Sequence, residues 1–143
     1  MKSQEVSLYQ EIQRNTEMAM KAIDTISDKI YDDALAMQMS RQSIRYSELH
    51  NEASRQLVEA KAQNYQGSAL ADVVLKTGLR YNTMLNTSTG RIAELMIKNS
   101  TNGILEMEKA LKHNEGAGER PVALAKQLIE LEEKNVARLK SYL

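Results

Sequence analysis

The chain has 143 residues, 42% of them hydrophobic, and its 19 basic side chains balance its 19 acidic ones. A chain of this length fits a single domain, residues 1–143, and its apolar content is enough for a core, which argues against disorder. The absence of cysteine excludes a disulfide scaffold, a thiolate metal site and a thiol nucleophile, and the even charge balance argues against nucleic acid as a partner.

The first predicted helix covers residues 3–26, and the second covers residues 28–62. In both, apolar side chains recur at steps of three and four residues, which places one apolar stripe on each helix for burial against partner helices. Ser27 or Asp28 is a suitable N-cap between them, because either side chain can accept a hydrogen bond from a free backbone N–H of the second helix. The stripe of the second helix consists of Leu35, Met39, Gln42, Tyr46, Leu49, Ala53, Leu57 and Ala60.

The third helical segment, residues 68–113, is longer than its neighbours and would measure about 70 Å as one continuous helix. Its residues 99–103 read Asn-Ser-Thr-Asn-Gly and are rich in side chains that compete for helical hydrogen bonds. We therefore expect a kink or a short interruption there. The alternative is one unbroken helix whose overhang packs on a second subunit.

The last predicted helix covers residues 119–142, and Pro121 falls in its first turn, where the missing N–H costs nothing. Glycine and asparagine mark loops at residues 64–68 and 114–120. Short loops between long helices favour antiparallel neighbours. The sequence therefore predicts an all-α fold, an antiparallel up-down-up-down four-helix bundle.

A bundle of this kind invites a test for a di-iron centre, which requires inward glutamates and two Glu-x-x-His pairs. The histidines of the chain are His50 and His113, and the residues three positions before them are Ser47 and Ala110. Neither histidine belongs to such a pair, so the sequence argues against a complete di-iron centre. It also contains no nucleophile elbow, phosphate loop or dinucleotide fingerprint, and we predict no catalytic residue and no cofactor.

Three glutamates fall on or beside apolar stripes and are candidates for a carboxylate layer inside the bundle: Glu11, Glu94 and Glu132. A buried carboxylate needs a partner or a raised pKa, so a layer of three could hold a metal ion or a small ligand. The alternative is that these side chains lie at the stripe edges and reach solvent or a lysine.

Neutral polar residues also occupy stripe positions. Two interpretations remain open, a polar pocket or hydrogen bonds that set the register of the bundle. These residues are Asn15, Gln42, Thr77, Ser88, Asn99 and Asn135.

Several stretches have a distinctive order of residues: 81–88 reads YNTMLNTS and 91–103 reads RIAELMIKNSTNG. Together with shorter stretches at 11–22, 124–128 and 132–135, they resemble a family of small uncharacterised proteins of Gram-positive anaerobic bacteria. The resemblance implies a ferritin-like four-helix architecture without an established activity. The family has a histidine where this chain has Arg91, which argues further against a metal role.

The sequence thus favours a non-enzymatic structural or interaction protein that self-associates, with a homodimer as the expected assembly and an unidentified protein as a further partner. The alternative is a ferritin-like protein that binds a metal or a small ligand in the carboxylate layer. No window approaches the ~20 apolar residues of a membrane span, and residues 1–5 begin no signal peptide. We therefore expect a cytoplasmic protein with no membrane contact.

Overall fold

The computed structural model describes residues 1–67, 78 and 88–143, and this part of the chain is helical without any strand. The prediction of an all-α protein is confirmed. No helix within these residues has a stretch long and apolar enough to cross a membrane. The elements are α1 (Ser3–Ile26), the 3-10 turn η1 (Ser27–Lys29), α2 (Asp33–Glu59), α4 (Thr89–His113), α5 (Glu119–Leu139) and the 3-10 turn η2 (Lys140–Tyr142).

Local capping explains where the second helix begins. The predicted start at residue 28 is wrong, because residues 27–29 form η1 and α2 begins only at Asp33. Asp32 is the N-cap, and its carboxylate accepts a hydrogen bond of 2.8 Å from the backbone N–H of Leu35. One of the free N–H groups of the first turn is thereby satisfied.

The third predicted segment is not one continuous helix. Ser88 has an extended backbone, and its hydroxyl accepts a hydrogen bond of 3.3 Å from the N–H of Arg91, so a new helix begins at Thr89. Apart from residue 78, the predicted helix over residues 68–87 lies outside the described residues.

The kink expected at residues 99–103 is also absent, since α4 runs unbroken from Thr89 to His113. The hydroxyl of Thr101 donates to the carbonyl of Ile97 at 2.9 Å, within its own helix, and the hydroxyl of Ser100 donates to Glu132 on α5. These side chains form hydrogen bonds without displacing a backbone bond, which is why they do not interrupt the helix.

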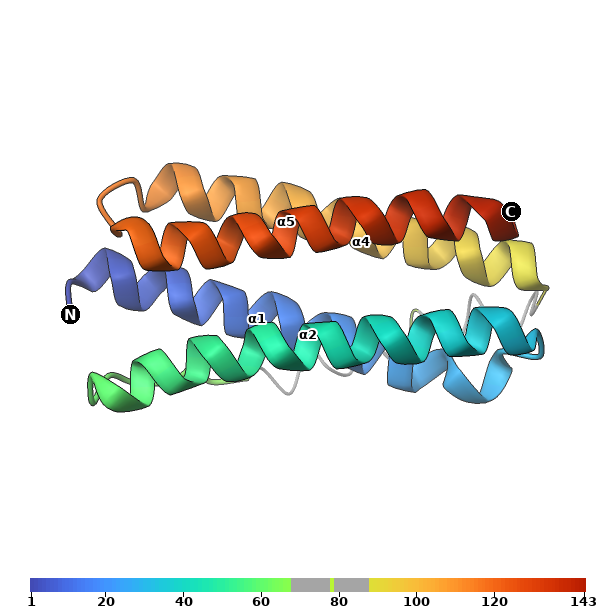
Figure 1. Cartoon of the computed structure of the whole chain (residues 1–143), viewed down its shortest axis with the longest axis horizontal. Helices are drawn as coiled ribbons and strands as arrows, with labels where there is room; N and C mark the ends of the chain where they lie inside the picture. Colours follow the sequence, from blue (N-terminus) through green and yellow to red (C-terminus); the bar gives the residue numbers. More distant parts are fainter. Residues whose placement is uncertain (68–77, 79–87) are drawn as a thin grey trace.

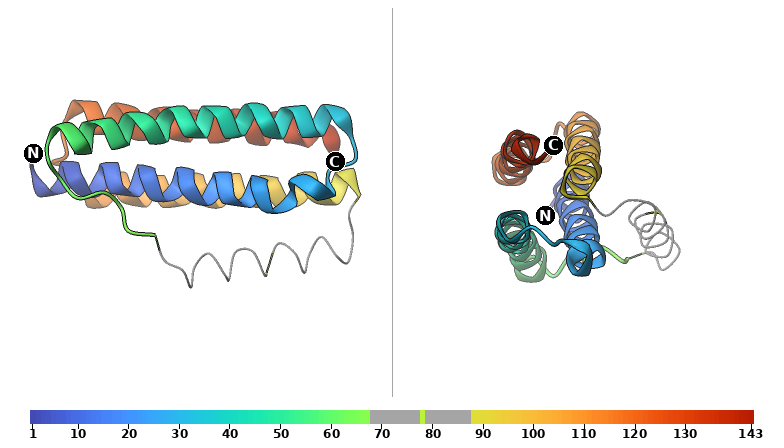
Figure 2. Two further views of the ribbon diagram at one scale, coloured as in Figure 1. Left: turned by 90° about the horizontal axis from the view of Figure 1, so that it is seen from below. Right: turned by 90° about the vertical axis from the view of Figure 1, so that its right-hand side faces the viewer.

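The helices form two layers, α1 beside α2 and α4 beside α5, and the two layers lie one on the other (Figure 1). Seen end-on in Figure 2, α4 lies over α1 and α5 lies over α2. In Figure 1, α1 and α5 run in one direction along the bundle, and α2 and α4 run in the other. Each helix is therefore antiparallel to both of its neighbours.

Among the four described helices, the order of directions along the chain is up-down-down-up, which differs from the expected up-down-up-down order. The C-terminus of α2 and the N-terminus of α4 lie at opposite ends of the bundle (Figure 1). These two ends, Glu59 and Thr89, are therefore a bundle length apart, and no short turn can join them.

The core includes the stripe predicted on α2, whose residues are all buried except Ala60. On α5, Leu124, Leu128 and Leu131 are buried, whereas Leu143 at the end of the predicted stripe is 68% exposed. Phenylalanine and tryptophan are missing from the sequence, so aliphatic side chains and methionine fill the interior. Each fully buried side chain of this size stabilises the fold by about 1.5–3 kcal/mol. The largest fully buried apolar side chains are Leu8, Ile12, Ile26, Leu35, Met39, Leu57, Ile92, Met107, Leu128 and Leu139.

Candidate functional site

A cluster of polar side chains interrupts the apolar core where three helices meet. Tyr46 comes from α2, Ser100 from α4, and Glu132 and Asn135 from α5. All four are buried, with exposed fractions between 0% and 4%. The stripe pattern brings each residue to the inside of its own helix, and the packing of α2 and α4 against α5 brings the four together.

Within this cluster, one carboxylate oxygen of Glu132 receives all the hydrogen bonds. Oε1 accepts from the hydroxyl of Tyr46, from the hydroxyl of Ser100 at 3.2 Å, and from the amide of Asn135 at 3.4 Å. The same amide donates to the Tyr46 oxygen at 3.0 Å. Three donors on one oxygen hold the carboxylate in a fixed orientation.

The other oxygen, Oε2, points at Gly103 of α4. A Cβ atom at position 103 would overlap Oε2 and lie 3.4 Å from the carboxylate carbon of Glu132. No hydrogen bond to Oε2 is formed within residues 1–67 and 88–143. The missing side chain of Gly103 thus provides the room in which a buried carboxylate keeps one oxygen unused.

Burial dominates the electrostatics of the cluster. It raises the pKa of Glu132 from 4.5 to about 7, although the hydrogen bonds from Tyr46, Ser100 and Asn135 act in the opposite direction. Burial also raises the pKa of Tyr46 well above its ordinary value, and the charge of Glu132 adds to this effect. At neutral pH the Tyr46 hydroxyl therefore stays a donor, while Glu132 exchanges between its protonated and ionised forms.

Glu132 lines a pocket of about 380 Å³ between α1 and α4. Its walls are apolar at Met18 and Met96 and polar at Asn99. Arg14 also lines this pocket and lies 3.6 Å from Glu11 and 3.8 Å from Glu106, so two carboxylates offset its charge. A pocket with apolar walls and a few converging polar groups is typical of small-molecule sites.

The three glutamates predicted for a carboxylate layer lie in different surroundings. Glu11 pairs with Arg14, and half-exposed Glu94 pairs with Arg91 at 3.2 Å and with Lys98 at 3.4 Å. The hydrogen bonds from these two cations lower the pKa of Glu94. Only Glu132 is buried, and within the described residues no three acidic or histidine side chains lie close enough to hold a metal ion.

The neutral polar residues of the stripes serve several purposes. Asn135 belongs to the cluster, Ser88 caps α4, and Asn15 donates to the carbonyl of Glu11 at 2.9 Å. In residues 1–67 and 88–143, Oδ1 of Asn135 and Nε2 of buried Gln42 have no hydrogen-bond partner. Thr77 lies outside the described residues.

Sequence reasoning identified Glu132 but missed Tyr46 as its donor and Gly103 as the residue that makes room for it. Tyr46 was assigned to the apolar stripe, which gives no sign that its hydroxyl needs a partner. Gly103 was assigned to a helix break. A glycine in the middle of a helix that does not break is the signal that a side chain of another helix approaches closely.

Comparison of the chain with models of protein families, with curated proteins and with solved structures finds no match. The resemblance to a family of Gram-positive anaerobes therefore stays a prediction. Part of the stretch that carries it, residues 81–87, lies outside the described residues.

Proposed function

We propose that this protein is a non-enzymatic binding protein that takes a small, positively charged amine into the pocket over Glu132. The observation that carries the proposal is the unused oxygen of a buried carboxylate. Oε1 of Glu132 accepts three hydrogen bonds, whereas Oε2 accepts none within the described part of the chain and lies beside Gly103. An ammonium group supplies the donors and the charge that this oxygen lacks.

The remaining walls of the pocket suit the rest of such a ligand. Met18 and Met96 offer apolar contact to a short aliphatic chain, and the amide of Asn99 offers a hydrogen bond. The cluster holds one carboxylate with no second acid or histidine, which favours an amine over a metal ion, because a metal ion takes several such ligands.

Binding of an amine is coupled to a proton. With its pKa at about 7, Glu132 is only partly ionised at neutral pH. A bound ammonium group favours the ionised carboxylate, so the carboxyl proton is released on binding. Affinity should therefore rise as the pH increases from 5 to 8.

The test is a nuclear magnetic resonance titration of the protein with n-butylammonium chloride, and with n-butanol as the uncharged analogue. We expect saturable shifts at α1 and α4 residues of the pocket for the amine alone. Glu132→Gln should abolish them, and the matched control Glu133→Gln, at an exposed neighbouring position, should leave them unchanged. Equal binding of n-butanol, or equal loss in both variants, would refute the proposal.

We propose further that the fold is ferritin-like. Ferritin-like bundles contain one long crossover connection, and the end of α2 and the start of α4 lie a bundle length apart (Figure 1). This topology supports the assignment, as does the resemblance found in the sequence. A bacterial source and the cytoplasm as compartment remain predictions.

Self-association is a second candidate function, and we propose that a second copy of the chain packs on α2. Met37, Ile44 and Val58 are exposed there, with side chains 57–64% accessible. They lie 7 and 14 residues apart, which places them within about 60° of one another around the helix. Apolar positions that recur every seven residues are typical of helices that pack in pairs.

Sedimentation at micromolar concentration tests this assembly. The native chain should sediment as a dimer, and Ile44→Glu should sediment as a monomer because the substitution places a charge inside the proposed contact. Ala137→Glu adds the same charge at an exposed position of α5, outside that contact, and should remain dimeric. A monomeric native chain would end the proposal.

A further inference from the structure

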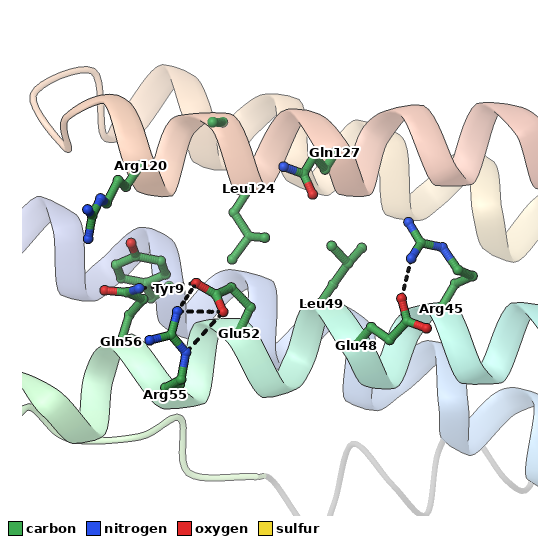
Figure 3. Close-up of a pocket in the computed structure, with 11 residues that line it drawn as sticks. Tyr9, Arg45, Glu48, Leu49, Glu52, Arg55, Gln56, Arg120, Leu124 and Gln127 are labelled. Carbon is green, nitrogen blue, oxygen red and sulfur yellow. Dashed lines mark hydrogen bonds and ion pairs between the residues drawn. The ribbon is translucent and has the colours of Figure 1, made fainter.

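A groove of about 650 Å³ opens between α2 and α5, whereas the Glu132 pocket is lined mainly by residues of α1 and α4. Figure 3 shows its walls: Arg120, Leu124 and Gln127 from α5 face Leu49 and Gln56 of α2. Tyr9 of α1 also lines the groove, and Figure 3 shows it near Arg120. The groove shares no lining residue with the Glu132 pocket.

Two of the three arginines that line this groove are paired with glutamates. Arg55 donates to both oxygens of Glu52, at 2.7 Å and 3.2 Å, and Arg45 pairs with Glu48 (Figure 3). Arg120 forms no hydrogen bond or ion pair with another residue of 1–67 or 88–143. Arg55 also pairs with Glu59 at 3.0 Å. Arg120 is therefore the arginine of the groove that has no direct ion-pair partner in the described part of the chain.

The second group without a partner is the hydroxyl of Tyr9. Tyr9 is 2% exposed and its ring packs in the core, yet within the described ranges its hydroxyl makes no hydrogen bond. Burial raises the pKa of this hydroxyl, and the charges of Glu5 and Glu52 add to the effect, so it remains a proton donor. The charge of Arg120 acts on the same hydroxyl, and Figure 3 shows Arg120 extending from α5 toward Tyr9.

We infer that this groove binds a small organic carboxylate between Arg120 and Tyr9. A guanidinium group forms two parallel N–H···O bonds with a carboxylate, and the hydroxyl of Tyr9 donates a third bond to it. The amide of Gln127, which Figure 3 draws on the groove side of α5, is a further donor. Leu49 and Leu124 supply an apolar wall that an inorganic anion would leave unused.

The experiment is a nuclear magnetic resonance titration of the full chain with benzoate, acetate and benzyl alcohol at constant ionic strength. Benzoate should shift the resonances of groove residues in a saturable way and bind more tightly than acetate, because it adds contacts with the two leucines. Benzyl alcohol has the ring without the charge and should not bind.

Two variants test the two polar groups. Arg120→Gln should weaken benzoate binding at least tenfold, and Tyr9→Phe, which removes only the hydroxyl, should weaken it several-fold. Arg138→Gln is the matched control, since it removes the same charge from an exposed position of α5 outside the groove. Circular dichroism of each variant establishes that the helices are intact.

The inference is overturned if Arg138→Gln weakens binding as much as Arg120→Gln, because the anion would then respond only to net charge. It is also overturned if benzyl alcohol binds as well as benzoate, or if Tyr9→Phe binds benzoate like the native chain. These outcomes are independent of the Glu132 pocket, whose amine titration uses other residues.

Discussion

Replacement of Glu132 by glutamine should remove a pH dependence from the stability of the bundle. Burial raises the pKa of this carboxyl from 4.5 to about 7, so the folded chain holds the proton more tightly than the unfolded chain does. The stabilisation is complete below pH 4.5, falls as the pH rises toward 7, and is lost above it. A difference of about 2.5 pH units corresponds to about 3 kcal/mol at 1.36 kcal/mol per unit.

Urea unfolding of the native chain and of Glu132→Gln between pH 4.5 and 8 measures this effect. As the pH rises from 4.5 to 8, the native chain should lose about 3 kcal/mol of its free energy of unfolding through this carboxyl. Glutamine does not titrate, so the variant should not show this loss. This difference is independent of any constant cost of the substitution. Glu133→Gln, at an exposed position, should follow the native profile. Parallel profiles for the native chain and Glu132→Gln would refute the buried, proton-holding carboxyl.

Three further substitutions test other parts of the structure. Tyr46→Phe should cost about 1–3 kcal/mol in urea unfolding and raise the pKa of Glu132 further, because the charged carboxylate loses its hydroxyl donor; an unchanged pKa would contradict the assigned hydrogen bond. Gly103→Ala should abolish n-butylammonium binding by displacing Oε2, while a helix-propensity gain of about 1 kcal/mol limits the loss of stability; unchanged binding would contradict the role of the glycine. Asp32→Ala should cost about 1 kcal/mol in thermal unfolding, and Asp33→Ala, beside the cap, should cost less.

The helix boundaries show how much of the secondary structure can be predicted from neighbouring residues in the sequence. The predicted helix over residues 3–26 agrees with α1, and Pro121 lies in the first turn of α5 as expected. The start of α2 was missed because Ser27, Asp28 and Asp32 are all suitable caps, and only the observed η1 turn decides among them. When several residues are equally suitable N-caps, the sequence alone does not show where the helix begins, because the packing of the whole helix decides it.

The candidate site shows the same limit at the level of side chains. An acid between two apolar stripe positions identifies Glu132 as a residue of interest, and the structure buries it. The same reasoning selected Glu11 and Glu94, which instead pair with nearby arginines at the helix surface. A residue at the edge of an apolar stripe and one at its centre differ by only a fraction of a helical turn. The position of the neighbouring helix determines which of the two is buried.

By itself, the sequence determined that this chain forms helices, where most of them run, and which face of α2 is buried, because periodicity and capping are properties of neighbouring residues. The tertiary structure alone decided the order of helix directions, the unused oxygen of Glu132 and the joining of Tyr9 with Arg120 in one groove. Each of these depends on residues far apart in the chain, whose meeting is set by the packing of whole helices.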